Sequence, residues 1–157
     1  MAVLFCCGRV TLTNCDVLDN TAQNNTSGAI AQNCHLTLEN VTIKGNTTAN
    51  ASNAYTPGLT LRNSNYNNFS FTIKGAVTVE NNTMAGKTDD AVYIYNGRNI
   101  AVGGELTNTA PIKIRLQSGT GVLTSGWKAN MGGADPSKYF TSDNSSYVTN
   151  ISLSSTR

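Results

Sequence analysis

The chain has 157 residues, of which 11 are Lys or Arg and 9 are Asp or Glu, so its formal net charge is only +2. This length fits one domain with a substantial core, while the weak charge argues against a nucleic-acid-binding protein. No apolar run reaches the roughly 18 residues that a membrane-spanning helix needs. Asn and Thr occur 21 times each and Gly 14 times. This composition predicts strands separated by many tight turns and argues against a helical enzyme.

Residues 1–9 contain a short apolar stretch with no basic region before it, which is not the pattern of a signal peptide. We expect this segment to form an N-terminal edge or cap, and the chain to be part of a longer polypeptide. The first quarter also holds all four cysteines, at spacings that match no zinc site. We interpret them as small buried side chains with free thiols, although disulfides remain open for Cys6, Cys7, Cys15 and Cys34.

An internal repeat begins at residue 10. Residues 10–21 align without a gap on residues 36–47, which lie 26 positions later, and a third copy with one inserted residue covers 71–83. A degenerate fourth copy starts at Asn99. Short apolar segments at 28–31, 58–61 and 91–94 separate the copies. Apolar residues alternate with polar or aromatic ones, as Leu36 and Leu38 do around Thr37 and Val92 and Ile94 around Tyr93. Every repeat is therefore predicted to hold three short strands.

The repeat predicts bends rather than chain reversals between its first two strands. Asn14, Asn40 and Gly75 occupy equivalent places there, and both residue types tolerate the left-handed conformation that bends a chain sharply. Short strands, bends and this period are typical of a parallel β-helix. We therefore predict an all-β solenoid of about three to four coils over residues 10–104, right-handed because parallel crossovers have that hand.

Stacked coils place equivalent residues in columns about 4.8 Å apart. Asn20, Asn46 and Asn82 each follow the second strand of a repeat, and we expect their amides to hydrogen-bond in a ladder. Residues 58–61 align with 91–94, whereas the same alternation would turn Ile30 outward, which leaves the register of residues 28–31 open. The apolar columns predicted to point inward are Val10/Leu36/Phe71/Ile100, Leu12/Leu38/Ile73/Val102, Cys15/Val41/Val77 and Val17/Ile43/Val79.

Residues 105–157 are predicted to form the final strands and a C-terminal β cap. Residues 110–116 alternate as a strand, with Ile112, Ile114 and Leu116 inward and Lys113 and Arg115 outward. Further strands are expected at 121–124 and 146–153. The open end of a solenoid needs a cap, and we expect four aromatic residues to plug it: Trp127, Tyr139, Phe140 and Tyr147.

The repeats, followed by residues 91–95, 100–104 and 132–140, resemble the C-terminal end of the right-handed parallel β-helix region of bacterial adhesin-like cell-surface proteins. The resemblance implies a secreted or surface-attached protein whose partners are a glycan or host surface. Further coils of its own chain, or self-association through the N-terminal edge, are the other partners expected. Some such proteins share their coil with polysaccharide lyases. A carbohydrate-active β-helix, lyase-like or glycan-binding, is therefore the alternative.

The outward positions predict no catalytic, cofactor or metal site. The predicted outer columns carry mainly Thr and hold no carboxylate pair of the kind that glycosidases use. Glu39 with Lys74 and Lys44 with Glu80 are expected to form surface ion pairs, His35 to be an ordinary turn residue, and Asp89 and Asp90 to lie in a solvated loop. Regular Thr-x-Thr rows would indicate ice binding, yet only Thr11 and Thr13 follow that pattern. We therefore predict a non-catalytic structural or adhesion segment, located extracellularly or at the cell surface.

Overall fold

The structure, a computed structural model, describes residues 4–5, 8–23, 28–32, 34–49, 56–61, 69–95, 98–117 and 123–143. This part of the chain is mostly β-strand, as the composition predicted. It also contains a short helix, α1 (Trp127–Met131), and one 3-10 turn, η1 (Pro136–Lys138). Within the described ranges, no helix has the length and apolar character needed to cross a membrane.

The described strands form three sheets that are almost entirely parallel. The exception lies in a four-strand sheet, where β10 pairs antiparallel with β9. The six-strand sheet holds β1 (Leu4–Phe5), β4 (Ile30–Gln32), β7 (Leu59–Leu61), β11 (Val92–Ile94), β13 (Ile112–Leu116) and β15 (Phe140–Ser142). The five-strand sheet holds β2 (Arg9–Leu18), β5 (His35–Lys44), β8 (Phe71–Glu80), β12 (Ile100–Leu106) and β14 (Thr124–Ser125). The four-strand sheet holds β3 (Thr21–Ala22), β6 (Thr47–Thr48), β9 (Thr83–Met84) and β10 (Lys87–Thr88).

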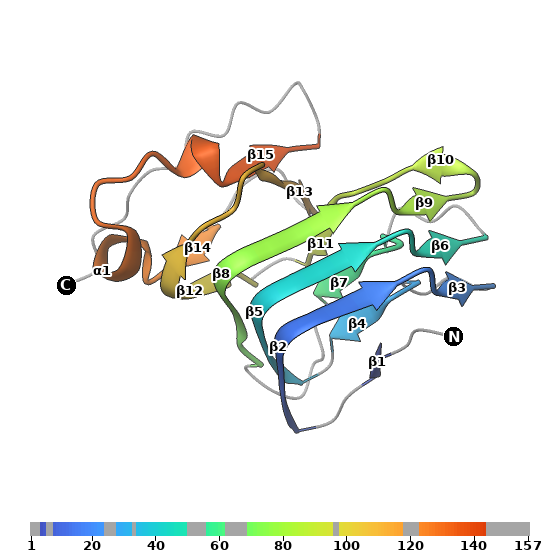
Figure 1. Ribbon diagram of the computed structural model, residues 1–157, viewed down its shortest axis with the longest axis horizontal. Helices are drawn as coiled ribbons and strands as arrows, with labels where there is room; N and C mark the ends of the chain where they lie inside the picture. Colours follow the sequence, from blue (N-terminus) through green and yellow to red (C-terminus); the bar gives the residue numbers. More distant parts are fainter. Residues whose placement is uncertain are drawn as a thin grey trace.

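The chain visits the three sheets in a fixed rotation. It passes through the six-strand, five-strand and four-strand sheets as β1–β2–β3, then β4–β5–β6, then β7–β8–β9. After β10 the described strands alternate between the first two sheets, from β11 to β15. Figure 1 shows the result: β2, β5 and β8 lie side by side, with β3, β6 and β9 beyond their carboxyl ends. Each strand therefore pairs with its equivalent from the next repeat.

The register of the five-strand sheet confirms all four predicted columns. Leu12 pairs with Leu38, Leu38 with Ile73, and Ile73 with Val102, and the other three columns follow in the same way. The strands differ from the prediction in being continuous over ten residues rather than split in two. The bends are present within them, because Asn14, Asn40 and Gly75 have φ values of 50°, 53° and 66°.

The start of β4 gives the register that the sequence left open for residues 28–31. Ile30 pairs with Leu59 and is fully buried, so it points inward rather than outward. The chain passes very close to its neighbours at Gly28, where an added Cβ would lie 2.8 Å from the carbonyl oxygens of Thr47 and Pro57. The β4 strand begins only at Ile30, beyond this close approach. A shift of one residue reverses the face of every side chain in a strand.

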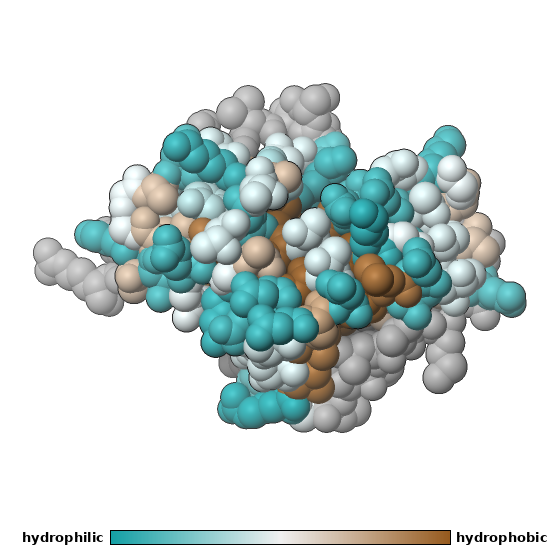
Figure 2. Space-filling view, in the orientation of Figure 1, coloured by the Kyte–Doolittle hydropathy of each residue, from teal (hydrophilic) through white to brown (hydrophobic). Residues whose placement is uncertain are grey.

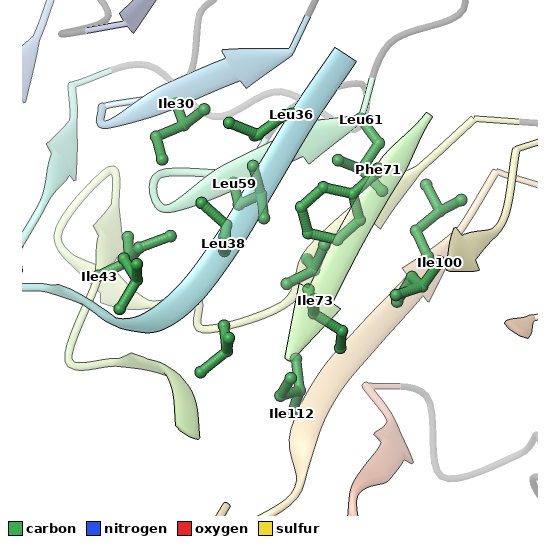
Figure 3. Packing of buried hydrophobic residues seen from close by; sticks show 14 of the residues in the cluster. Ile30, Leu36, Leu38, Ile43, Leu59, Leu61, Phe71, Ile73, Ile100 and Ile112 are labelled. Carbon is green, nitrogen blue, oxygen red and sulfur yellow. The ribbon is translucent and has the colours of Figure 1, made fainter. Parts of the chain in front are cut away.

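The core lies between the sheets and is built from the inward columns (Figure 3). The six-strand sheet is buried on its other face as well, because Thr60 and Tyr93 are 0% and 4% exposed although they alternate with core residues. Thr56 satisfies part of this buried polar surface: its amide donates to Thr60 Oγ1 at 3.0 Å, and its hydroxyl donates to the Leu59 carbonyl. This face is therefore covered at β7 and β11, whereas Lys113 of β13 is exposed on it.

A small aromatic cluster follows the last strand of the five-strand sheet. The Trp127 ring is buried and meets Tyr139 edge to face at 5.6 Å and Phe140 at 6.0 Å. Asn130 of α1 donates to the Val102 carbonyl at 2.7 Å, which fixes the helix against β12. Three of the four aromatic residues expected to plug this end thus pack together. Tyr147 and the strand expected at 146–153 lie outside the described residues, and α1 itself was not predicted.

Candidate functional site

The outer side of the five-strand sheet carries aligned threonines. Before the bend, Thr11, Thr37 and Thr72 stand in register and Ala101 continues the row, while Thr42 and Thr78 align beyond it. We call Thr11, Thr37, Thr72, Thr42 and Thr78 the outer threonine face. Their side chains are exposed or partly exposed, and the side of the molecule in Figure 2 is largely polar. This face offers hydroxyl groups on a rigid sheet.

Two ion pairs join β5 to β8, as the sequence predicted. Lys74 Nζ lies 2.8 Å from Glu39 Oε2, and Lys44 Nζ lies 2.9 Å from Glu80 Oε1. The hydrogen bond with Glu80 raises the pKa of Lys44 above its ordinary value. Each carboxylate is thus matched by a cation on the neighbouring strand. Neither pair places two carboxylates together for acid–base chemistry.

The residues Asp89 and Asp90 do not form the solvated loop expected from the sequence. Asp89 accepts a bidentate pair from Arg115 at 2.9 and 3.0 Å, and Arg115 Nε donates to Asp143. Asp90 accepts from the Asn82 amide at 2.7 Å. Burial lowers the pKa of Arg115, but the hydrogen bonds that it donates to Asp89 and Asp143 outweigh burial and hold that pKa above its usual value. Both carboxylates are therefore occupied by protein partners.

The Arg115 cluster was missed by sequence reasoning, because the repeat alignment does not place its members opposite one another. Asp89 precedes Arg115 by 26 residues and Asp143 follows it by 28. In the sheet, Arg115 pairs with Tyr93 of β11, so Asp89 lies outside that strand pairing, whereas Asp143 directly follows Ser142, which pairs with Ile114 of β13. The cluster ties β13 to the segment before β11 and to the residue after β15.

We predict that Arg115→Met leaves two poorly solvated carboxylates unpaired and lowers the free energy of unfolding by about 2 kcal/mol. The side chains of Asp89 and Asp143 are only 10% and 15% exposed, so water replaces the lost partner incompletely. Urea denaturation measures the effect. Lys113→Ala, on the same strand but exposed, should change stability by less than about 0.5 kcal/mol. Equal effects of the two variants would contradict a structural role for the cluster.

The His35 ring is held by Ser70 and Phe69, and Cys34 and Cys15 are the cysteines that the structure describes. The Ser70 amide donates to His35 Nδ1 at 3.2 Å, so Nδ1 is an acceptor. The His35 ring also meets the Phe69 ring edge to face, with 5.5 Å between their centroids. Cys34 is fully buried and disulfide-bonded, to a partner outside the described residues. The expectation of a free thiol is therefore wrong for Cys34, and it is confirmed for Cys15, which is partly buried. A disulfide sulfur supplies no thiolate nucleophile.

The asparagine ladder is present as predicted. Asn46 accepts from both the amide and the side chain of Asn20, and Asn82 accepts in the same way from Asn46 at 3.0 and 2.9 Å. Asn46 and Asn82 are fully buried. The side-chain amides of Asn46 and Asn82 are bonded to the neighbouring repeats or to backbone carbonyls. The row therefore stabilises the stack and is not open to a ligand.

Metal-binding geometry is absent from the described ranges, where no three His, Cys, Asp or Glu side chains come together. Comparison with protein-family models, curated proteins and solved structures returned no match. The outer threonine face is thus the candidate functional surface. Its threonines lie on paired strands next to charged residues such as Asp16, and their hydroxyl groups suit many weak hydrogen bonds.

Proposed function

We propose that this chain is a right-handed parallel β-helix that serves as a non-catalytic structural or adhesion segment of a secreted or surface-attached bacterial protein. The observation that carries the proposal is the fixed rotation of the chain through three parallel sheets, with each strand paired to its equivalent in the next repeat. About three to four coils and a C-terminal cap account for it. Right-handedness follows from the preference of parallel crossovers for that hand.

Such a stack suits a spacer that must stay extended outside a cell. Backbone groups of one circuit bond to the next, and the asparagine ladder satisfies the chain where it leaves the five-strand sheet. A repeat array of this kind is stabilised by contacts between neighbouring repeats. The apolar columns join β2, β5 and β8, and two of them continue into β12, so contacts between neighbouring repeats oppose local opening.

The disulfide at Cys34 supports an extracellular location. Disulfides persist in oxidising compartments and are uncommon in the reducing cytosol. Cys34 lies directly before β5 and is fully buried, so its bond belongs to the packed core. This chemistry favours a protein exposed to the medium.

The outer threonine face is the proposed contact with a glycan or host surface. Its hydroxyl groups donate and accept hydrogen bonds, as sugar hydroxyls do. The ion pairs beside it cancel locally, so charge contributes little to the contact. A carbohydrate-active enzyme remains the competing function, and product formation distinguishes the two.

The test is to incubate the chain with pectins, alginates and glycosaminoglycans and to measure both binding and products. We expect binding without unsaturated or reducing-end products. Removing two hydroxyls with Thr37→Val and Thr72→Val should weaken binding about tenfold, whereas Thr109→Val, an exposed control away from the sheets, should not. Turnover that a single outer-face substitution abolishes would show an enzyme instead.

A further inference from the structure

The β2 strand ends the five-strand sheet and, among the described residues, pairs only with β5. Its inward residues continue the apolar columns but are only partly buried, whereas their partners in β5 are 0–1% exposed. Leu18, at the end of the strand, is 45% exposed. Figure 2 shows hydrophobic atoms in the region where Figure 1 draws β2. The apolar columns thus stop at an open edge. The inward residues are Val10, Leu12, Cys15 and Val17.

The hydrogen bonds of β2 show which of its amides face that open edge. His35 donates to the Gly8 carbonyl at 2.9 Å, and Asp19 donates to the Lys44 carbonyl at 3.0 Å. Successive residues of a strand direct their amides to opposite neighbours. The inward residues therefore bond to β5, and the outward ones direct their amides to the open edge. These outward residues are Arg9, Thr11, Thr13, Asp16 and Leu18.

The strand is symmetric about the midpoint between Thr13 and Asn14. Of the residues that point inward, residue 10 corresponds to residue 17 and residue 12 to residue 15. Of those at the open edge, residue 9 corresponds to residue 18 and residue 11 to residue 16. The bend at Asn14, where φ is 50°, lies at this same midpoint. A twofold axis through the bend would therefore exchange the two arms of the strand. It would keep every inward side chain inward and set the open-edge amides of residues 9 and 11 opposite those of residues 18 and 16, with Thr13 opposite Asn14 at the bend.

We propose that the open edge of β2 docks a second copy of this chain through antiparallel β2–β2 pairing across that axis. Arg9 and Thr11 then exchange backbone hydrogen bonds with Leu18 and Asp16 of the partner subunit. Val10 and Leu12 lie opposite Val17 and Cys15 of the partner subunit, as the closely spaced pairs that make no backbone bonds. The core of one copy continues into the core of the other.

Charge supports this register. Arg9 lies diagonal to Asp16 of the partner subunit on the outward face, a distance that a long side chain spans. The same contact occurs twice by symmetry, and no like charges oppose each other. A head-to-tail stack is disfavoured, because the other end of this sheet is the two-residue strand β14 with α1 packed beside it. The inference rests on the sheet edge and not on the proposed role in adhesion, so each can fail without the other.

Light scattering on the chain of residues 1–157 should give twice the 16.6 kDa mass of one chain. Leu12→Cys tests the register, because it places a thiol opposite the free Cys15 of the partner subunit at a spacing that a disulfide bridges. Mild oxidation should then give a covalent dimer that reductant separates. The double variant Leu12→Cys, Cys15→Ser should give none. A covalent dimer in that control, or none in Leu12→Cys, would overturn the register.

Charge reversal provides an independent test that leaves the fold intact. Asp16→Lys should weaken dimerisation about tenfold at low salt, since two contacts become repulsive. Adding Arg9→Glu to that variant should restore it. A strictly monomeric chain would overturn the proposal, and slow amide exchange at Thr11 and Asp16 in that monomer would show that a segment of the same chain covers the edge. Assemblies that grow beyond two chains with concentration would also overturn it, in favour of head-to-tail stacking.

Discussion

Replacing Leu38 with alanine should lower the free energy of unfolding by about 3 kcal/mol. Leu38 is fully buried and stands in its column between Leu12 and Ile73. Figure 3 shows its side chain among the labelled core residues. Neighbours on both strands are fixed by backbone pairing, so the cavity cannot collapse easily. Urea denaturation followed by far-ultraviolet circular dichroism measures the loss.

The matched control is Leu12→Ala, one position earlier in the same column. Leu12 is only partly buried because no described strand lies beyond β2, so its loss should cost about 1 kcal/mol in the monomer. The measurement is made at low protein concentration, where pairing through β2 does not contribute. Equal losses for the two variants would contradict the difference in burial between the edge strand and the interior strand.

The sequence predicted the five-strand sheet well for two physical reasons. Strict alternation fixes which residues face the core, and an ungapped offset of 26 residues fixes their partners. Left-handed conformations at Asn14 and Asn40 followed from the same alignment. The asparagine ladder and the two ion pairs are consequences of this register. They could be predicted because each joins equivalent or neighbouring positions of successive repeats.

Other features depend on tertiary contacts that the repeat does not encode. The offset of Ile30 follows from a close approach at Gly28, and the burial of Thr60 from the segment at Thr56. Both lie next to spacers whose lengths vary between repeats, so no alignment constrains them. The helix α1 appears beyond the last clear repeat, where packing of Trp127 decides the local structure.

Replacing Asn46 with alanine should lower the free energy of unfolding by about 3 kcal/mol, because several buried groups lose their partner at once. Asn46 Oδ1 accepts from the amide and side chain of Asn20, and its Nδ2 donates to the Val17 carbonyl and to Asn82. The residue is fully buried, so water cannot replace these bonds. A water molecule in the gap left by the amide would not replace both its accepting oxygen and its donating nitrogen.

Asn40→Gly tests whether the stability lost in Asn46→Ala comes from the burial of Asn46 or from its place in a row of stacked asparagines. Asn40 also bonds to neighbouring circuits, donating to Asn14 and accepting from the Ala76 amide, but its side chain is exposed. Glycine keeps its left-handed backbone conformation, and water replaces the lost bonds, so the cost should stay below about 1 kcal/mol. Thermal and urea unfolding of both variants give the comparison. If Asn40→Gly proved as costly as Asn46→Ala, the stack would depend on the number of interstrand amide bonds rather than on their isolation from water.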